Sequence, residues 1–213
     1  GPAQTPAPAV SLIDGLGRAV TLAAPAQKIV SLAPSNTEIL FAVGAGAQVI
    51  GRDDFSDYPE SAKTLPAVGG MGPYNTEQIV ALKPDLVLAA EINTPELVKS
   101  LEALGLTVYY LKNPTTLDEM YGNLEIVAKL TGHAADAAAL VKSLKARVAA
   151  VDEKMMPLSS RFSVFYELDS TNPAKPWTAG KGTFITQLIA RAGGFNIAAD
   201  LDPYPQMSLE QIV

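Results

Sequence analysis

An internal repeat is the feature that most constrains how this chain can fold. Residues 75–80 (NTEQIV) recur as residues 208–213 (SLEQIV), and both copies carry a helix-capping residue two positions before the glutamate. Upstream, residues 40–46 align loosely with residues 188–194, and both segments read as helices that end in glycine. Each half therefore contains a strand, a helix ending in glycine and a capped helix with Glu-Gln-Ile-Val, which predicts two related lobes.

The pattern from Lys28 onward predicts that these lobes are α/β. Strands are expected at KIVSLA, VIGR, DLVLAA and VYYL, and helices between them at TEILFAVGA, TEQIVALK and PELVKSLEALG. This alternation is typical of a mainly parallel sheet covered by helices. Residues 10–22 predict two short strands joined by a tight hairpin, because Gly15 and Gly17 can supply the positive φ values that such a turn requires. A dinucleotide loop is not expected, because a third glycine and a following helix are missing.

A long helical pattern separates the two halves. Apolar residues recur at helical spacing over 134–156, about 35 Å at 1.5 Å per residue, after a further helix predicted over 118–130. We predict an N-terminal α/β lobe over 10–130, a connecting long helix over 131–156 and a partial C-terminal α/β lobe over 157–213. That last lobe should contain a strand RFSVFYEL, a Pro-rich loop and a helix TFITQLIARAGG. Residues 1–9 read as a tag remnant and a Pro/Ala linker.

The second copy of the repeat is shorter than the first. A strand, a helix and a further strand follow the first Glu-Gln-Ile-Val helix, whereas the sequence stops at Val213. We expect a second lobe that lacks part of its sheet, either because the sequence is truncated or because the missing strands come from elsewhere. Its exposed strand edge would be open to dimerisation or strand exchange.

Composition excludes several function classes. The formal net charge of -6, without a Lys/Arg cluster, argues against nucleic acid as a partner. The chain has no cysteine and one histidine, His133, which we expect to be a solvent-exposed residue at a helix start; a zinc or copper site is therefore not expected. No Ser-His-Asp set, P-loop or Gly-x-Ser-x-Gly is present, and Asp53-Asp54 and Asp200/Asp202 read as turn formers. We predict no catalytic residues and no enzyme.

Aromatic residues in predicted loops are the candidates for ligand contact. In an open α/β lobe, ligands bind outside the carboxyl ends of the strands, where such loops gather. The alternative is that each aromatic residue caps the core of its own lobe. Glu77 and Glu210 suit the first turn of a helix, and their recurrence suggests docking onto a twofold basic partner. The loop aromatics are Phe55, Tyr58, Tyr74, Trp177 and Tyr204.

Together these segments resemble the helical-backbone class of periplasmic binding proteins, which serve ABC importers for vitamin B12, haem and iron-siderophores. The resemblance covers residues 10–213 through KIVSLAPSNTEILFAVGAGAQVIG, NTEQIVALKPDLVLA, GTFITQLIARAGGFNI and PYPQMSLEQIV. FSDYP, PWTAGK and PYPQ make the chain most similar to the cobalamin-binding proteins. The resemblance implies two Rossmann-like lobes joined by one long helix, with the ligand in the cleft between them.

The resemblance also implies roles for individual residues. Trp177 and Tyr204 match aromatic cleft residues of the second lobe, and Phe55 and Met71 fall on cleft-lining loops of the first, although a family member has tryptophan in place of Met71. Glu77 and Glu210 match glutamates that dock onto arginines of the permease dimer, which works with its ATPase subunits. The full set of ligand-binding candidates is Ser35, Asn36, Arg52, Phe55, Tyr58, Met71, Tyr74, Trp177 and Tyr204.

The resemblance leaves the ligand open among three chelates. Tyr58 and Tyr74 could serve as the iron ligand of a haem protein, and Arg52 could bind a siderophore, but a cleft histidine is missing; a corrinoid is therefore favoured. The transported chelate is the cargo, and no resident cofactor or metal is expected. We expect an extracytoplasmic location, with a lipid anchor in the precursor. A different reading is an interaction module with a vestigial cleft, whereas an enzyme or metal-cluster scaffold would require clustered cysteines or histidines.

Overall fold

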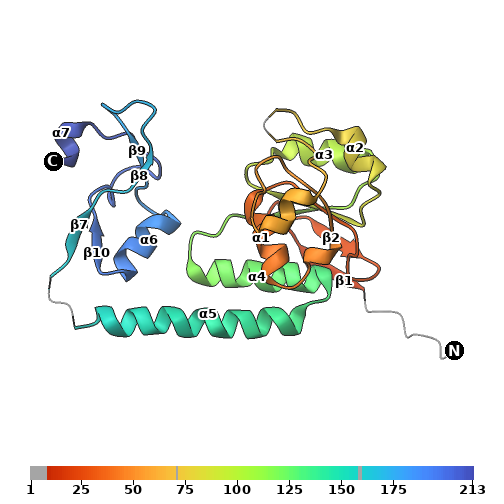
Figure 1. Ribbon diagram of the computed structural model, residues 1–213, viewed down its shortest axis with the longest axis horizontal. Coiled ribbons are helices and arrows are strands. Elements are labelled where there is room, and N and C mark those ends of the chain that lie inside the picture. Colours follow the sequence, from red (N-terminus) through yellow and green to blue (C-terminus); the bar gives the residue numbers. More distant parts are fainter. Residues whose placement is uncertain (1–8, 71, 158–159) are drawn as a thin grey trace. The chain divides into compact units, whose positions relative to one another are not determined.

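A computed structural model describes residues 9–70, 72–157 and 160–213, which divide into two compact units (Figure 1). The first unit comprises the described residues up to Asn113 together with Tyr121–Val141. The second comprises the described residues of Pro114–Met120 and Lys142–Val213. The division falls within one helix, α5 (Ala134–Met155), so this helix contributes residues to both units.

A four-stranded parallel sheet forms the centre of the first unit. Its strands are β3 (Ile29–Ser31), β4 (Val49–Arg52), β5 (Leu86–Ala90) and β6 (Val108–Leu111), in the order β4-β3-β5-β6. Every residue of β3, β5 and β6 is buried. A parallel sheet covered on both faces needs apolar side chains on both, which explains the continuous apolar runs of these strands. The predicted parallel α/β lobe is confirmed.

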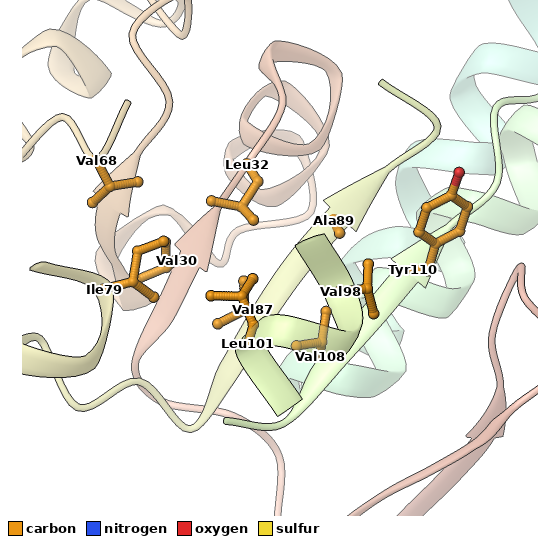
Figure 2. Packing of buried hydrophobic residues seen from close by; sticks show 10 residues of the cluster. All are labelled: Val30, Leu32, Val68, Ile79, Val87, Ala89, Val98, Leu101, Val108 and Tyr110. Atoms are coloured by element: carbon orange, nitrogen blue, oxygen red, sulfur yellow. The ribbon is translucent and has the colours of Figure 1, made fainter. Parts of the chain in front are cut away.

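Two helices, α2 (Thr76–Ala81) and α3 (Pro95–Ala103), supply side chains to one face of this sheet. The helices α1 (Pro34–Ala42) and α4 (Leu117–Thr131) lie on the other side (Figure 1). Each Val or Leu side chain buried in this way contributes about 1.5–3 kcal/mol. The cluster on the first face is shown in Figure 2 and consists of Val30, Leu32, Val68, Ile79, Val87, Ala89, Val98, Leu101, Val108 and Tyr110.

Capping residues start the helices where the sequence predicts. The Asn75 side chain accepts a hydrogen bond from the backbone N–H of Gln78 (3.0 Å), and Thr94 accepts one from Leu97 (3.2 Å). These bonds satisfy backbone donors that have no partner inside the helix. Two short 3-10 helices, η1 (Gly46–Gln48) and η2 (Glu60–Thr64), complete the first unit's helical segments in the part that the structure describes.

A hairpin of β1 (Val10–Ile13) and β2 (Ala19–Leu22) attaches to the edge strand β6. The Tyr109 hydroxyl donates to the Ile13 carbonyl (2.8 Å). In the turn, the buried Asp14 carboxylate accepts from the N–H groups of Leu16 (3.0 Å) and Arg18 (2.9 Å) and pairs with the Arg18 guanidinium. Gly17 has φ 77°, as a tight turn requires. The predicted hairpin is confirmed.

Asp14→Asn should destabilise the first unit in a pH-dependent way. Burial alone raises the pKa of the Asp14 carboxyl, but the hydrogen bonds from Arg18 and Leu16 outweigh burial and lower the pKa overall. The ionised carboxylate therefore stabilises the fold above the ordinary Asp pKa of about 4, and this contribution is lost as the pH falls. We expect a loss of about 2–3 kcal/mol at pH 7 and a smaller loss at about pH 3, measured by urea unfolding. An equal loss at both pH values would contradict this account.

The second unit repeats the first half of this architecture. The strand β7 (Phe162–Val164), the helix α6 (Phe184–Arg191) and the strand β10 (Gly194–Asn196) form a parallel strand-helix-strand unit, as β3, α1 and β4 do. After both helices a glycine takes a positive φ, 91° at Gly44 and 80° at Gly193. A short helix α7 (Leu209–Ile212) follows, as α2 does in the first unit. The structure confirms the internal repeat.

The prediction of one continuous strand at RFSVFYEL is wrong. This segment forms two strands, β7 and then β8 (Glu167–Asp169), which pair with different partners. β7 pairs in parallel with β10, whereas β8 pairs antiparallel with β9 (Trp177–Thr178). The apolar run is continuous in the sequence. It forms two strands because its two parts pair with different strands, β10 and β9, which come later in the chain.

His133 is half-buried, which corrects the expectation of a solvent-exposed helix-start residue. Its Nδ1 lies 3.0 Å from the Asp136 carboxylate in the first turn of α5, and its Nε2 lies 3.1 Å from the Gln48 side-chain oxygen. The amide nitrogen of Gln48 donates to the carbonyls of Ala26 (2.7 Å) and Thr131 (3.0 Å), which fixes the direction of that oxygen. His133 therefore joins the beginning of α5 to the amino end of the first-unit sheet.

Candidate functional site

The carboxyl edge of the first-unit sheet is the candidate ligand site in that unit. β3 lies between β4 and β5; the chain leaves β3 through α1 toward β4, and leaves β5 through α3 toward β6. Because these two connections run in opposite directions, the loops after β3 and β5 flank the point where α/β sheets bind ligands. The loop after β5 contains Asn93, and Ser35 is the second residue of α1, directly after the loop that follows β3.

A set of hydrogen bonds joins the loop after β3 to the loop after β5. The Tyr74 hydroxyl donates to the Leu32 carbonyl (2.9 Å) and lies 2.9 Å from the Asn93 amide nitrogen, which also donates to the Leu32 carbonyl (3.2 Å). The other side of the Asn93 amide accepts from the backbone N–H of Ala90 (2.8 Å). Sequence reasoning did not select Asn93. The available signal was its position, three residues after the end of a buried parallel strand.

A second network holds the loop after β4. Asp53 is buried, and its carboxylate accepts from the backbone N–H of Phe55 (2.8 Å) and from the Ser56 hydroxyl. Ser56 in turn lies 2.8 Å from the Thr37 hydroxyl of α1, which donates to Ser31 of β3 (2.8 Å). Asp53 is thus a turn former, as predicted. The network fixes the backbone that presents Phe55 to solvent.

The predicted site residues of the first unit fall into two groups. Phe55 (49% exposed), Tyr58 (66% exposed) and Ser35 present surface to solvent. Asn36 is buried and donates to the Leu88 carbonyl (3.1 Å). The Arg52 guanidinium donates to backbone carbonyls of its own unit, including that of Asp53 (2.7 Å). Met71 lies outside the described residues.

Trp177 and Tyr204 lie on adjacent segments of the second unit. Backbone hydrogen bonds join residues 176–180 to residues 203–207, from Thr178 N–H to the Pro205 carbonyl (3.0 Å) and from Met207 N–H to the Pro176 carbonyl (3.1 Å). Both aromatic side chains are accessible, with 44% of Trp177 and 60% of Tyr204 exposed. The structure thus brings together these two predicted site residues, which are 27 positions apart in the sequence.

Glu77 and Glu210 occupy the same helical position in their respective units. Each is the second residue of its helix, α2 for Glu77 and α7 for Glu210, and each is exposed. A capping residue precedes both helices; in α7 the Ser208 backbone N–H donates to the Gln211 side chain (2.9 Å). Neither residue is buried within its own unit, so both carboxylates are accessible to a partner.

The chemistry of Tyr74 argues against a role as an iron ligand. Burial raises the pKa of the Tyr74 hydroxyl, the hydrogen bond from Asn93 lowers it, and the charges of Asp53 and Asp54 raise it, with a raised pKa as the net result. A ligand to ferric iron would have to be the phenolate, which these surroundings disfavour. Tyr58 is the other tyrosine among the residues singled out in this unit, and its side chain is largely exposed.

A cavity of about 600 Å³ lies at the opposite, amino end of the sheet. It is lined largely by small residues, among them Pro25 and Gly132, together with Gln48 and His133. The polar atoms of Gln48 and His133 are already hydrogen bonded to each other and to neighbouring groups. Among the described residues there is no cluster of three or more His, Cys, Asp or Glu side chains that could hold a metal ion. We therefore place the candidate site at the carboxyl edge instead.

The fold defines a class of protein: an α/β protein built from two related units, each with parallel strands and covering helices. The chain belongs to the periplasmic binding protein family, because the model of that family matches residues 29–213. It is 36% identical over 209 residues to the uncharacterized ABC transporter substrate-binding lipoprotein YvrC of Bacillus subtilis, covering 96% of this chain and 66% of that protein. The chain spans 54–66% of the length of the first curated relatives that it matches.

Solved structures of similar proteins carry titles that name vitamin B12 binding, heme binding and possible iron binding. The periplasmic vitamin B12 binding protein BtuF of Vibrio cholerae superposes with a TM-score of 0.76 at 32% identity, covering 88% of this chain and 72% of that chain. The periplasmic heme-binding protein RhuT of Roseiflexus sp. RS-1 superposes with a TM-score of 0.76 at 30% identity, with the same coverage. No helix in the described part of the chain is both long and apolar enough to cross a membrane.

Proposed function

We propose that this chain is the extracytoplasmic solute-binding component of an ABC importer, with no catalytic chemistry of its own. Membership of the periplasmic binding protein family carries this proposal. Further support comes from the exposed aromatic residues at the carboxyl edge of the first unit and on the paired segments of the second. The likeness to an ABC substrate-binding lipoprotein supports a lipid-anchored precursor.

The proposed cargo is a corrinoid. A corrinoid carries its own metal within the macrocycle, so the protein needs aromatic surface and hydrogen bonds and no strong metal ligand. This requirement suits the exposed aromatic side chains of Phe55 in the first unit and of Trp177 and Tyr204 in the second. The single histidine, His133, lies at the amino end of the first-unit sheet, away from its carboxyl edge. Haem is disfavoured at Tyr74, whose pKa is raised, and an anionic siderophore would meet an Arg52 already bonded to backbone carbonyls.

Within this proposal the candidate residues take two kinds of role. Trp177, Tyr204, Phe55 and Tyr58 contact the ligand through their rings, because large rigid aromatic surfaces bind apolar macrocycles with little loss of side-chain entropy. Ser35 offers a hydroxyl group. Asn36 and Arg52 act as positioning residues, since their polar groups already hold the loops of the first unit.

Titration of the chain with cyanocobalamin, cobinamide, haem and a ferric siderophore tests the proposal. Trp177 is the single tryptophan, so quenching of the intrinsic tryptophan fluorescence reports on its surroundings alone. We expect saturable quenching by a corrinoid. Saturation by haem or by the siderophore alone would replace the corrinoid with that ligand, and no response to any of the four would favour an interaction module whose cleft is vestigial.

Haem remains the second candidate because a haem-binding protein is as similar in fold as the vitamin B12 binding protein. Tyr74→Phe distinguishes the two cargoes. We expect this change to lower stability by about 1 kcal/mol through loss of the bond to the Leu32 carbonyl, and to weaken corrinoid binding only a few-fold. Urea unfolding and isothermal titration measure the two effects, with Tyr166→Phe, at an exposed tyrosine outside the candidate site, as the control. Loss of the absorption bands of iron-phenolate haem in Tyr74→Phe would establish Tyr74 as an iron ligand instead.

A further inference from the structure

The turn after β5 presents an isoleucine that the fold does not bury. The Asn93 N–H donates to the Ala90 carbonyl (2.8 Å), which closes a tight turn with Glu91 and Ile92 at its two central positions. The Ile92 side chain is 69% exposed. Glycine, proline and small polar residues dominate turn positions of this kind. Single exposed apolar residues are common on protein surfaces, so a role for Ile92 has to follow from its place in the fold.

That place is the candidate site of the first unit. β3 lies between β4 and β5. Neighbouring strands are about 4.8 Å apart, so the carboxyl ends of β4 and β5 lie about 10 Å from each other. The loop after β4 carries Phe55, which is 49% exposed, and the turn after β5 carries Ile92. The two large apolar residues therefore lie on either side of the loop after β3, where α/β sheets bind ligands.

A buried polar side chain fixes the backbone beside each of these residues. The Asp53 carboxylate accepts from the Phe55 N–H (2.8 Å), and the Asn93 side chain accepts from the Ala90 N–H (2.8 Å). Asp53 and Asn93 are both buried. The backbone that carries Phe55 and Ile92 is thus ordered before a ligand arrives, which lowers the entropic cost of contact through their side chains.

We propose that Ile92 contacts the ligand and selects a corrinoid over haem, an inference that rests on the proposed corrinoid cargo of this site. The rim of a corrin ring consists largely of saturated carbons with methyl groups and amide side chains, whereas haem is a flat conjugated ring. A branched aliphatic side chain packs closely against methyl groups, but it has no aromatic face on which a conjugated ring could stack. Ile92 therefore favours the corrin rim.

Ile92→Ala tests this contact, and Ile13→Ala is its matched control. Ile13 is 64% exposed and lies on β1, in the hairpin at the edge strand β6. Isothermal titration with cyanocobalamin should show about 5–20-fold weaker binding by Ile92→Ala, because apolar surface is lost from the contact. Binding by Ile13→Ala should equal that of the parent chain.

Two further substitutions test the selectivity itself. Ile92→Leu keeps the aliphatic surface and should bind cyanocobalamin as the parent chain does. Ile92→Phe supplies an aromatic face, and the ratio of cyanocobalamin affinity to haem affinity should fall at least about threefold. An unchanged ratio in Ile92→Phe would overturn the selecting role.

NMR separates a lost contact from a damaged turn. The Ala90 amide, which bonds the Asn93 side chain, should exchange equally slowly in the parent chain and in Ile92→Ala. In the parent chain, the δ1 methyl signal of Ile92 should shift on addition of cyanocobalamin, whereas that of Ile13 should not. This measurement needs no variant, so it holds even where a substitution disturbs folding.

The outcomes distinguish this inference from the proposed cargo. If the parent chain binds cyanocobalamin but its Ile92 methyl signal does not shift and Ile92→Ala binds equally well, the role of Ile92 is rejected and the corrinoid cargo stands. If the parent chain binds no corrinoid, the cargo and the role of Ile92 are rejected together.

Discussion

Replacing both Glu77 and Glu210 with alanine is expected to reduce ligand uptake through a reconstituted importer by at least about tenfold, while ligand binding by the isolated chain stays unchanged. Each carboxylate is exposed at the second position of its helix and makes no contact that its own unit requires for packing. Loss of a charge from a pair that is desolvated at an interface typically costs about 2–5 kcal/mol of association energy. The measurement is uptake into proteoliposomes that contain the cognate permease and its ATPase subunits, with isothermal titration of the free chain alongside.

The chain offers a matched control for this pair. Glu96 is also an exposed second residue of a capped helix, α3, but it lies outside the repeated Glu-Gln-Ile-Val motif. Glu96→Ala should lose the same favourable interaction with the helix dipole, about 0.3–1 kcal/mol, and leave uptake unaffected. If Glu96→Ala reduced uptake as strongly as the double variant, general surface charge would explain the effect and the docking role would be rejected.

Trp177→Ala is expected to weaken corrinoid binding about 10–50-fold. Its ring is half exposed on a segment whose backbone is fixed by pairing with residues 205–207, so truncation should remove aromatic surface without releasing the loop. Large aromatic residues that anchor a ligand commonly contribute about 1.5–2.5 kcal/mol. Because the variant has no tryptophan left, binding must be followed by isothermal titration or by corrinoid absorbance.

Two further variants separate ring contact from a general loss of apolar surface. Trp177→Phe should recover most of the affinity, since it keeps an aromatic face at the same place. Phe195→Ala removes another exposed aromatic side chain of the second unit, on β10, and should bind the corrinoid as the parent chain does. Equal weakening by Phe195→Ala and Trp177→Ala would indicate a disturbed second unit and no specific contact at Trp177.

The parallel sheet and the repeat could be predicted because both depend on local signals. A parallel strand covered on both faces has to be continuously apolar, and DLVLAA and VYYL meet this demand. The capped helices begin at residues whose side chains bond the first turn, and Asn75 does so in the structure. The same local reasoning predicted loops at Trp177 and Tyr204, which is wrong for Trp177, since it lies in the strand β9. It also did not predict the backbone hydrogen bonds that join the two segments.

The parts that could not be predicted depend on partners that are distant in the sequence. The split of the 162–169 segment follows from pairing with β10 and β9, and no residue within the segment marks it. The sequence predicts Asn36 in a loop and Arg52 at the end of a strand, but it does not show that Asn36 donates to the Leu88 carbonyl and Arg52 to the Asp53 carbonyl. The orientation of His133 depends on a hydrogen bond with Gln48, 85 positions earlier in the sequence. The role of Asn93 depends on its hydrogen bond to the Leu32 carbonyl. Hydrogen bonds between side chains and groups this distant in the sequence can be predicted only once the tertiary fold is known.

The bonds among Tyr74, Asn93 and Leu32 have a consequence for the kinetics of ligand association. Because they fix the loops after β3 and β5 in the free chain, the conformational entropy of these loops is already lost before a ligand arrives. Association at this edge should therefore proceed in a single exponential phase whose rate rises linearly with ligand concentration, without the plateau that a slow rearrangement would impose. In Asn93→Ala the loops regain freedom, and stopped-flow traces should acquire a second, concentration-independent phase.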